Sequence, residues 1–170
     1  ARFAHLPAIE AIIATGIDIN SRREYLSDQT TAIEQAITSH DILGEEEEKA
    51  DKRLEVVTYL LENGADPNTL DDDGKPVLHL AIDNSYNETR VMMTLIEHGA
   101  DTSIPDQGTG QTPFFQVVLR AERALLSAFL TTGVDIESTD PDGNTALHLY
   151  FKENSYVDIN FIRATVALGA

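Results

Sequence analysis

The sequence predicts an all-α solenoid of stacked helix-turn-helix repeats joined by β-hairpin-like loops. A glycine followed by an aliphatic residue recurs at Gly64, Gly99, Gly133 and Gly169, at intervals of 34 to 36 residues. Intervals of this length are typical of two-helix repeats that stack on one another. Apolar residues at helical spacing precede each of these glycines, and similar short motifs follow them. These recurring signals favour an extended binding surface over an active site.

The residues before each glycine predict the second helix of every repeat. Positions eight, seven, four and three residues before the glycine are mostly apolar, which places them on one helix face. The five stripes are Ala8, Ile9, Ile12 and Ile13; Val56, Val57, Leu60 and Leu61; Val91, Met92, Leu95 and Ile96; Leu125, Leu126, Phe129 and Leu130; and Phe161, Ile162, Thr165 and Val166. Each helix is expected to end at its glycine, the first at Gly16, with the glycine in the left-handed conformation.

A shorter first helix is expected in each of the later four repeats. The predicted starts lie near Thr31, Pro76, Thr112 and Thr145. Threonine suits the residue before a helix because its hydroxyl accepts a hydrogen bond from a free backbone N–H. Proline suits a helix start because the N–H that it lacks would have no partner there.

Four segments share one motif. Residues 71–81 read Asp-Asp-Asp-Gly-Lys-Pro-Val-Leu-His-Leu-Ala, and residues 142–149 read Asp-Gly-Asn-Thr-Ala-Leu-His-Leu. Residues 110–117 keep the turn but have Phe115 at the histidine position, and residues 29–36 are the weakest copy. In these motifs the chain resembles the ankyrin repeat family, whose pattern is Asp-x-x-Gly-x-Thr-Pro-Leu-His-x-Ala, followed by a helix ending Leu-Leu-x-x-Gly-Ala-Asp-x-Asn. The resemblance covers nearly the whole chain and implies repeats of a hairpin-like turn and two antiparallel helices.

The repeats predict one domain over residues 1–170. It consists of a partial N-terminal repeat (1–20), three repeats (21–68, 69–103 and 104–137) and a truncated last repeat (138–170). The first full repeat has about ten extra residues near 39–53, including a run of four glutamates. A run of like charge resists packing, which favours a solvated loop or an extension of the next helix over a docking element. Since both termini fall inside a repeat, we expect the protein to continue past Ala170.

Composition restricts the partners and the chemistry. The net charge is −17, with 12 basic and 29 acidic residues, which disfavours direct nucleic-acid binding and favours basic proteins or peptides. The same acidity equally serves solubility. With no cysteine in the sequence, disulfides and thiolate-bound metals are excluded and an intracellular location is favoured. No run approaches 18 apolar residues, so no membrane insertion is expected.

Two segments have part of the spacing of a calcium-binding loop. They are Thr69-x-Asp71-x-Asp73-Gly74 and Ser138-x-Asp140-x-Asp142-Gly143. The twelfth position of such a loop must be a bidentate carboxylate, but here it is Leu80 or Leu149. We therefore expect no calcium site, and we identify no other metal, cofactor or catalytic residue. For His79 and His148 the resemblance implies a structural hydrogen bond to the neighbouring turn.

We expect a non-enzymatic protein-interaction module that recognises a protein or peptide, with a basic partner favoured by the charge. Successive hairpins carry acidic residues and are expected to form one acidic ridge beside the concave face of the first helices. The candidate partner-binding residues are Asp71, Asp72, Asp83, Asn84, Asp106, Gln107, Arg120, Asp140, Phe151 and Lys152. The alternatives are a regulatory or targeting segment of a larger enzyme, channel or effector that packs on a neighbouring domain, and a structural spacer.

Aromatic residues gather in the later repeats. Phe114 and Tyr150 are expected in the core, whereas Phe151 and Tyr156 flank the turn of the last repeat and are expected to be partly exposed. An aromatic pocket beside carboxylates suits a basic or methylated side chain through cation–π attraction. The alternative is that these residues cover the end of the stack.

Overall fold

The computed structural model describes residues 6–22, 30–39, 46–83, 89–121, 123–130, 132–154 and 156–167, without the side chains of residues 6, 8, 46–50, 127 and 130. The chain forms two compact units, Ala1–Ala100 and Asp101–Ala170. The boundary between the two units lies after Ala100, directly after the turn that contains Gly99. Repeat arrays make contacts only between neighbours, so they can be divided between repeats without consisting of separate domains. A single repeat domain over 1–170 stays a prediction.

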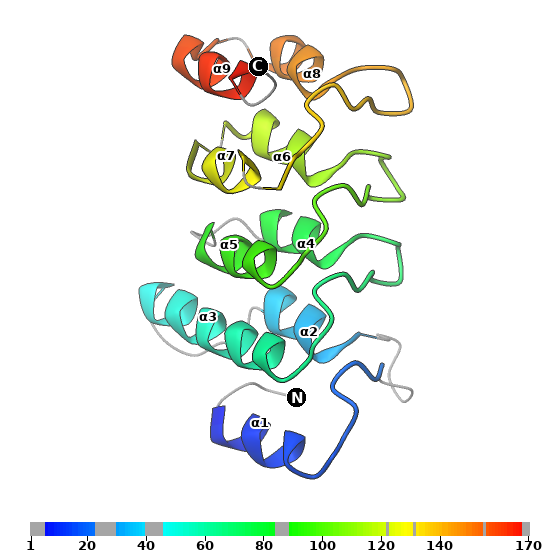
Figure 1. Ribbon diagram of the computed structural model, residues 1–170, viewed down its shortest axis with the longest axis vertical. Coiled ribbons are helices and arrows are strands. Elements are labelled where there is room, and N and C mark those ends of the chain that lie inside the picture. Colours follow the sequence, from blue (N-terminus) through cyan, green and yellow to red (C-terminus); the bar gives the residue numbers. More distant parts are fainter. Residues whose placement is uncertain are drawn as a thin grey trace. The chain divides into compact units, whose positions relative to one another are not determined.

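The first unit contains two packed helix pairs preceded by one helix. Its helices are α1 (Leu6–Ile13), α2 (Ala32–Thr38), α3 (Glu46–Glu62), α4 (Val77–Asp83) and α5 (Thr89–Glu97). The first helices α2 and α4 pack together, the second helices α3 and α5 pack together, and each pair is closed by contacts of α2 with α3 and of α4 with α5 (Figure 1). This arrangement confirms the predicted stack of helix-turn-helix repeats.

The second unit repeats the same arrangement. Its helices are α6 (Pro113–Leu119), α7 (Arg123–Leu130), α8 (Ala146–Glu153) and α9 (Ile159–Val166). The first helices α6 and α8 pack together, α7 packs on α6, and the second helices α7 and α9 are in contact. Strand pairing in the described residues is limited to two isolated antiparallel bridges, between Leu70 and Pro76 and between Thr139 and Thr145. The all-α fold class with hairpin-like loops is confirmed.

The first helices begin where the sequence predicted. Thr31 caps α2 in a reciprocal arrangement: the Glu34 N–H donates to the threonine hydroxyl at 3.4 Å, and the Thr31 N–H donates to the Glu34 carboxylate at 3.3 Å. Thr145 caps α8 with His148 in place of the glutamate. Thr112 precedes α6, which begins at Pro113. These caps satisfy backbone donors that the first turn of a helix leaves free.

The second helices end two or three residues before their glycines. Gly16, Gly64, Gly99 and Gly133 all have φ between +68° and +92°, as predicted for the residue that follows a helix. At the end of α3, the Gly64 N–H donates to the Leu61 carbonyl and the Ala65 N–H to the Leu60 carbonyl. The end of α5 has the same two bonds. Together they turn the chain from the second helix into the next hairpin.

The apolar stripes of α3, α5 and α7 form the core of their units. Of the stripe residues whose side chains are described there, Ile96 is half-buried and all the others are buried. The stripes of α1 and α9 are less covered: Ile12 is 48% exposed and Val166 is 50% exposed. A helix in a stack buries its whole apolar face only when a neighbour lies on each side. Ala8, Leu130 and Gly169 lie outside the described side chains.

The extra residues of the first full repeat lengthen a helix. α3 has 17 residues, whereas α5 has 9 and α7 and α9 have 8 each. Its first two turns come from the acidic segment, which confirms a helix extension over Glu46–Arg53. Residues 40–45 lie outside the described part. Among the described helices, none is long and apolar enough to cross a membrane.

Replacing Leu95 by alanine tests the stacked core. Leu95 is fully buried in α5, so Leu95→Ala should lower the free energy of unfolding by about 2–5 kcal/mol. Urea denaturation followed by circular dichroism measures the change. Ile12→Ala, at a half-exposed position of α1, is the control and should cost much less. An unchanged denaturation midpoint for Leu95→Ala would contradict the assigned core.

Candidate protein-recognition surface

The loop before α4 is a tight hairpin organised by one aspartate. The Asp71 N–H donates to the Lys75 carbonyl at 2.9 Å, and the Gly74 N–H donates to the Asp71 carbonyl at 3.0 Å. The Asp71 carboxylate accepts the N–H groups of Asp73 at 3.0 Å and Lys75 at 2.8 Å. The backbone of the loop is thus fixed from inside, while Asp72 and Asp73 remain exposed at its tip.

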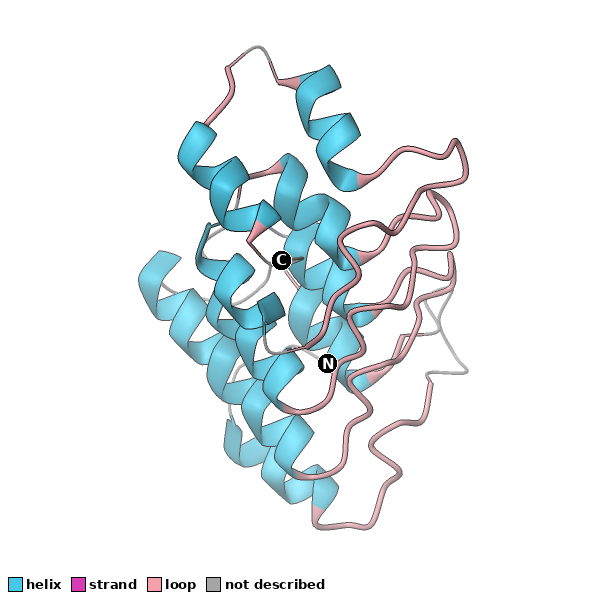
Figure 2. Cartoon of the chain, turned by 45° about the horizontal axis from the view of Figure 1, so that its top comes forward, coloured by secondary structure: helices cyan, strands magenta, loops and turns pink. Residues whose placement is uncertain are grey.

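The loop before α8 has the same geometry. The Asp140 N–H donates to the Asn144 carbonyl at 2.9 Å, and the Gly143 N–H donates to the Asp140 carbonyl at 3.0 Å. The Asp140 carboxylate accepts the N–H groups of Asp142 at 3.0 Å and Asn144 at 2.8 Å. Asp142 is exposed at the tip, at the position equivalent to Asp73. Figure 2 shows these loops as pink segments that extend away from the helices.

The loop before α6 is one residue longer than the loops before α4 and α8. Here the Asp106 N–H donates to the Gln111 carbonyl at 2.9 Å, and the Gly110 N–H donates to the Asp106 carbonyl at 2.7 Å. The Asp106 carboxylate accepts the N–H of Gly108 at 2.7 Å. Gln107 lies exposed at the tip. One inward aspartate therefore organises each of the three hairpins.

Three aspartates that were expected to bind a partner are buried or half-buried in their own loops, so the expectation that they are exposed was wrong. Asp106 is 4% exposed and Asp140 is 9% exposed, and Asp71 is half-buried. Their carboxylates face the loop amides, because these N–H groups would otherwise lack a partner. The resemblance to a calcium loop has the same origin: alternate aspartates and a glycine are what this turn requires. Among the described residues, no group of three or more His, Asp or Glu is arranged to hold a metal ion.

Two exposed candidates are held in ion pairs within the first unit. Asp72 pairs with Arg22 at 3.0 Å, and Asp83 pairs with Lys75 at 2.8 Å. Arg22 also bonds the Leu70 carbonyl and lies 3.5 Å from the buried carboxylate of Glu34. Arg22 therefore ties one loop to the next. Arg22 was not predicted from the sequence, because a single arginine in an irregular loop gives no periodic signal.

The remaining partner-binding candidates are exposed wherever the structure describes them. Gln107, Arg120, Phe151 and Lys152 are exposed, as expected, whereas Asn84 lies outside the described residues. The carboxylates of Asp71, Asp106 and Asp140 do not form a ridge of free charge. Partner binding by any of these residues stays a prediction.

The two repeated histidines have different surroundings. The His148 imidazole Nδ1 lies 2.8 Å from the Thr145 hydroxyl and 3.2 Å from the Thr145 backbone nitrogen. This confirms the expected structural contact with the turn. His79 is completely buried in α4.

The aromatic residues of the last repeat lie partly in the core. Tyr150 is buried against Phe161, with ring centroids 5.7 Å apart, and Phe114 is buried against Phe129. Phe151 is 54% exposed and Tyr156 is 83% exposed, as expected for residues that flank the last turn. Phe151 occupies the repeat position of Ile82 and Val118, which are both buried. An aromatic pocket for a basic side chain stays a prediction.

Comparison with known proteins agrees with this architecture. Residues 48–122 match the family model described as ankyrin repeats, in three copies. Residues 48–122 therefore belong to the ankyrin repeat family. Ankyrin repeats are non-catalytic protein–protein interaction modules, so the fold and its general role agree with the sequence analysis.

Proteins of very different kinds are similar to parts of this chain. The chain is 33% identical to nuclear factor NF-kappa-B p105 subunit of Gallus gallus over 107 residues, which are 61% of the chain and 11% of that protein. It is 34% identical to protein PhlB of Serratia liquefaciens over 98 residues, 58% of the chain and 42% of PhlB. Palmitoyltransferase AKR1 of Lachancea kluyveri is 33% identical over 96 residues, 55% of the chain and 13% of the enzyme. The chain spans less than half the length of each of these relatives.

Substitution of Gly110 tests how closely two hairpins approach. Gly110 has φ +69°, and a Cβ added there would lie 2.5 Å from Pro141 Cγ, whereas a Cβ at Gly143 with φ +81° would meet nothing within 4 Å. Gly143→Ala should therefore cost about 1–2 kcal/mol for the left-handed backbone alone, and Gly110→Ala should cost clearly more. Urea unfolding of both variants measures the difference. Equal losses would show that Pro141 moves aside freely.

Asp140 should make stability depend on pH in the acid range. The backbone N–H of Asn144 lowers the pKa of the Asp140 carboxyl below 3.8, helped by the Asn144 amide, the Asp142 N–H and Lys152, and opposed by burial. A pKa lowered by folding means that the ionised form stabilises the native state above about pH 3.9, and that this contribution is lost as pH falls through the lower folded-state value. Asp140→Asn should therefore flatten the loss of stability below about pH 4.

Thermal unfolding between pH 2 and pH 7 measures this effect. Asp142→Asn is the matched control, since it removes the neighbouring carboxylate at the exposed tip and leaves the inward one in place. Some acid sensitivity should remain in Asp140→Asn, because hydrogen bonds from Ser103 lower the pKa of Asp101 and a hydrogen bond from Arg123 lowers that of Asp158. Parallel pH curves for wild type and Asp140→Asn would contradict the assigned role of this carboxylate.

Proposed function

We propose that this chain is a non-enzymatic recognition module that binds a protein or peptide through its hairpin tips and the exposed side of its first helices. The observation that carries the proposal is the shared construction of the three hairpins. In each, an inward aspartate fixes the backbone, and the following residues are presented to solvent on a loop that is already ordered. Ordering before binding reduces the entropy that association costs.

A basic partner is the favoured class. Asp73 and Asp142 lie at equivalent exposed tip positions, and the chain carries a net charge of −17. A field of this sign accelerates the approach of positively charged segments. Exposed Gln107 and the half-exposed ring of Phe151 would add polar and apolar contacts. An intracellular location, supported by the absence of cysteine from the sequence, is part of the proposal.

A second candidate function has its own support at the last repeat. Phe151, Ile159 and Val166 are each about half exposed, and Ile162 is half-buried. The equivalents of Ile162 in the preceding repeats, Met92 and Leu126, are buried. Exposed apolar side chains at positions that a neighbour otherwise covers favour packing against an adjoining helical domain. In this alternative the chain is a regulatory or targeting segment of a larger protein.

The hairpin proposal is tested with peptides selected for binding to the protein from a random display library. The double variant Asp73→Asn/Asp142→Asn should slow association of the selected peptides, while dissociation changes less, because exposed charges act mainly on the approach of the partner. Raising the salt from about 50 mM to 500 mM should slow wild-type association about tenfold. Stopped-flow fluorescence measures both rates.

The control variant is Glu10→Gln/Glu97→Gln, which removes the same charge from exposed positions on α1 and α5. It should change association much less than the hairpin variant. Equal slowing by both variants would mean that diffuse acidity, and not the hairpin tips, attracts the partner. Selected peptides with no excess of lysine and arginine, bound independently of salt, would contradict a basic partner.

A further inference from the structure

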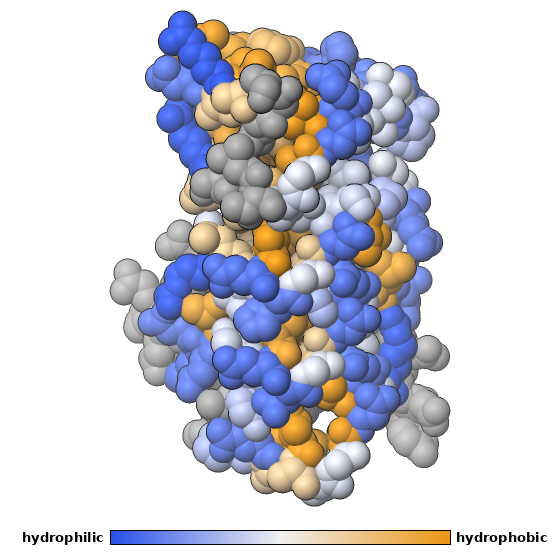
Figure 3. Space-filling model, viewed as in Figure 1, coloured by the Kyte–Doolittle hydropathy of each residue, from blue (hydrophilic) through white to orange (hydrophobic). Residues whose placement is uncertain are grey.

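A shallow groove runs along the second helices of the first unit, away from the hairpins. It has a volume of about 550 Å³ and is bounded by one face of α3 and by Arg90 at the start of α5. The α3 residues that line it are spaced three, four, seven, eight and eleven positions after Asp51, which places them on one side of the helix. On the face shown in Figure 3, hydrophilic residues surround smaller apolar areas.

The floor of this groove is mainly apolar. Leu54, Thr58 and Tyr59 line it and are all half-buried. The Thr58 hydroxyl donates to the Leu54 carbonyl at 2.7 Å, so its polar group is satisfied within the helix and its methyl group is left for contact. The aromatic ring of Tyr59 offers a face to a cation or an aliphatic chain.

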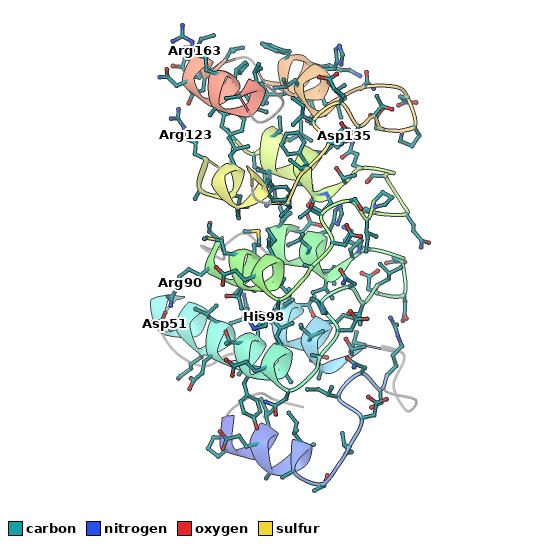
Figure 4. All side chains as sticks on the ribbon, viewed as in Figure 1. Asp51, Arg90, His98, Arg123, Asp135 and Arg163 are labelled. Atoms are coloured by element: carbon teal, nitrogen blue, oxygen red, sulfur yellow. The ribbon has the colours of Figure 1, made fainter. Side chains whose placement is uncertain are left out.

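The rim of the groove is acidic. Glu55 and Glu62 are exposed, and both belong to the lining face of α3. Asp51 lies in the extension that α3 has and the other second helices lack, and it pairs with Arg90 at 2.5 Å (Figure 4). This pair closes one end of the groove and uses its only described basic residue. The rim therefore keeps an excess of negative charge over an apolar floor.

We propose that this groove binds an amphipathic helical segment with lysine or arginine residues two turns apart. Glu55 and Glu62 are seven residues apart, about 10 Å along α3, which matches two basic side chains seven residues apart on a helix lying along the groove. Their aliphatic stems cover Leu54 and Tyr59, and their charged ends reach the two carboxylates. This site lies on second helices, so it is independent of the proposed recognition by the hairpins.

The probe is a fluorescently labelled 18-residue peptide of leucine, alanine and lysine, with lysines seven residues apart on one helix face. Its affinity is measured by fluorescence anisotropy at about 150 mM salt. Glu55→Gln/Glu62→Gln should weaken binding about five- to tenfold, as expected for two exposed ion pairs. Tyr59→Ala should weaken it further. Because Glu55 and Glu62 are exposed, their replacement leaves the fold intact, and circular dichroism verifies this.

Any basic peptide is attracted to a protein of this charge, so two controls isolate the groove. Asp73→Asn/Asp142→Asn lowers the charge equally but lies on the hairpins, and it should change the affinity less than twofold. A peptide with the same composition and shuffled lysine positions should bind several-fold more weakly. Equal effects of the two double variants, no effect of the groove variant, or equal binding of the shuffled peptide would each overturn the proposal. A loss only in the hairpin variant would overturn the groove while supporting recognition by the hairpins.

Discussion

The burial of the apolar stripe on each second helix is the constraint on which the rest of the structure depends. Leu60 and Leu95 are buried in the last turns of α3 and α5, and their carbonyls accept the N–H groups of Ala65 and Ala100 just beyond the glycines. The same residues that bury the helix thus help to close it. One helix pair cannot cover its stripe alone, so every loop must return the chain in the same direction and bring the next pair alongside.

That requirement explains why aspartates take two roles in each hairpin. A tight loop leaves several N–H groups without a helical or strand partner, and an inward carboxylate can accept two or more of them. Asp71, Asp106 and Asp140 do so, which removes their charge from the set available to a partner. The next residues at the tips owe their fixed presentation to these internal bonds. Net charge alone therefore overstates how much of the acidity serves recognition.

Sequence periodicity predicted the features that depend on position along a helix. The caps at Thr31 and Thr145 and the left-handed glycines after α3 and α5 lie where the repeats placed them. Periodicity does not show which faces have a neighbour, so it could not separate buried Leu95 from half-exposed Ile12.

Side-chain direction within a loop was equally hidden from the sequence. Asp140 and Asp142 are two residues apart and chemically identical, yet only the first turns inward. The ion pair of Arg22 with Asp72 joins residues 50 positions apart in the sequence. This separation does not match the interval of 34 to 36 residues between repeats, so periodicity could not predict the pair. The sequence therefore predicted where the loops of the site lie, but not which of their carboxylates are exposed to solvent.

Specificity for one partner depends on the features that differ between repeats, because a feature common to all repeats cannot distinguish one repeat from another. The hairpins before α4 and α8 are nearly superposable in their hydrogen bonds, so they offer similar tips and little discrimination between partners. The lengthened α3 breaks that equivalence. Its extension supplies Asp51, which pairs with Arg90 and gives one pair of second helices a closed groove end. A partner that contacted both a regular tip and this groove would bind in a single position. Identical repeats by themselves would allow several equivalent positions.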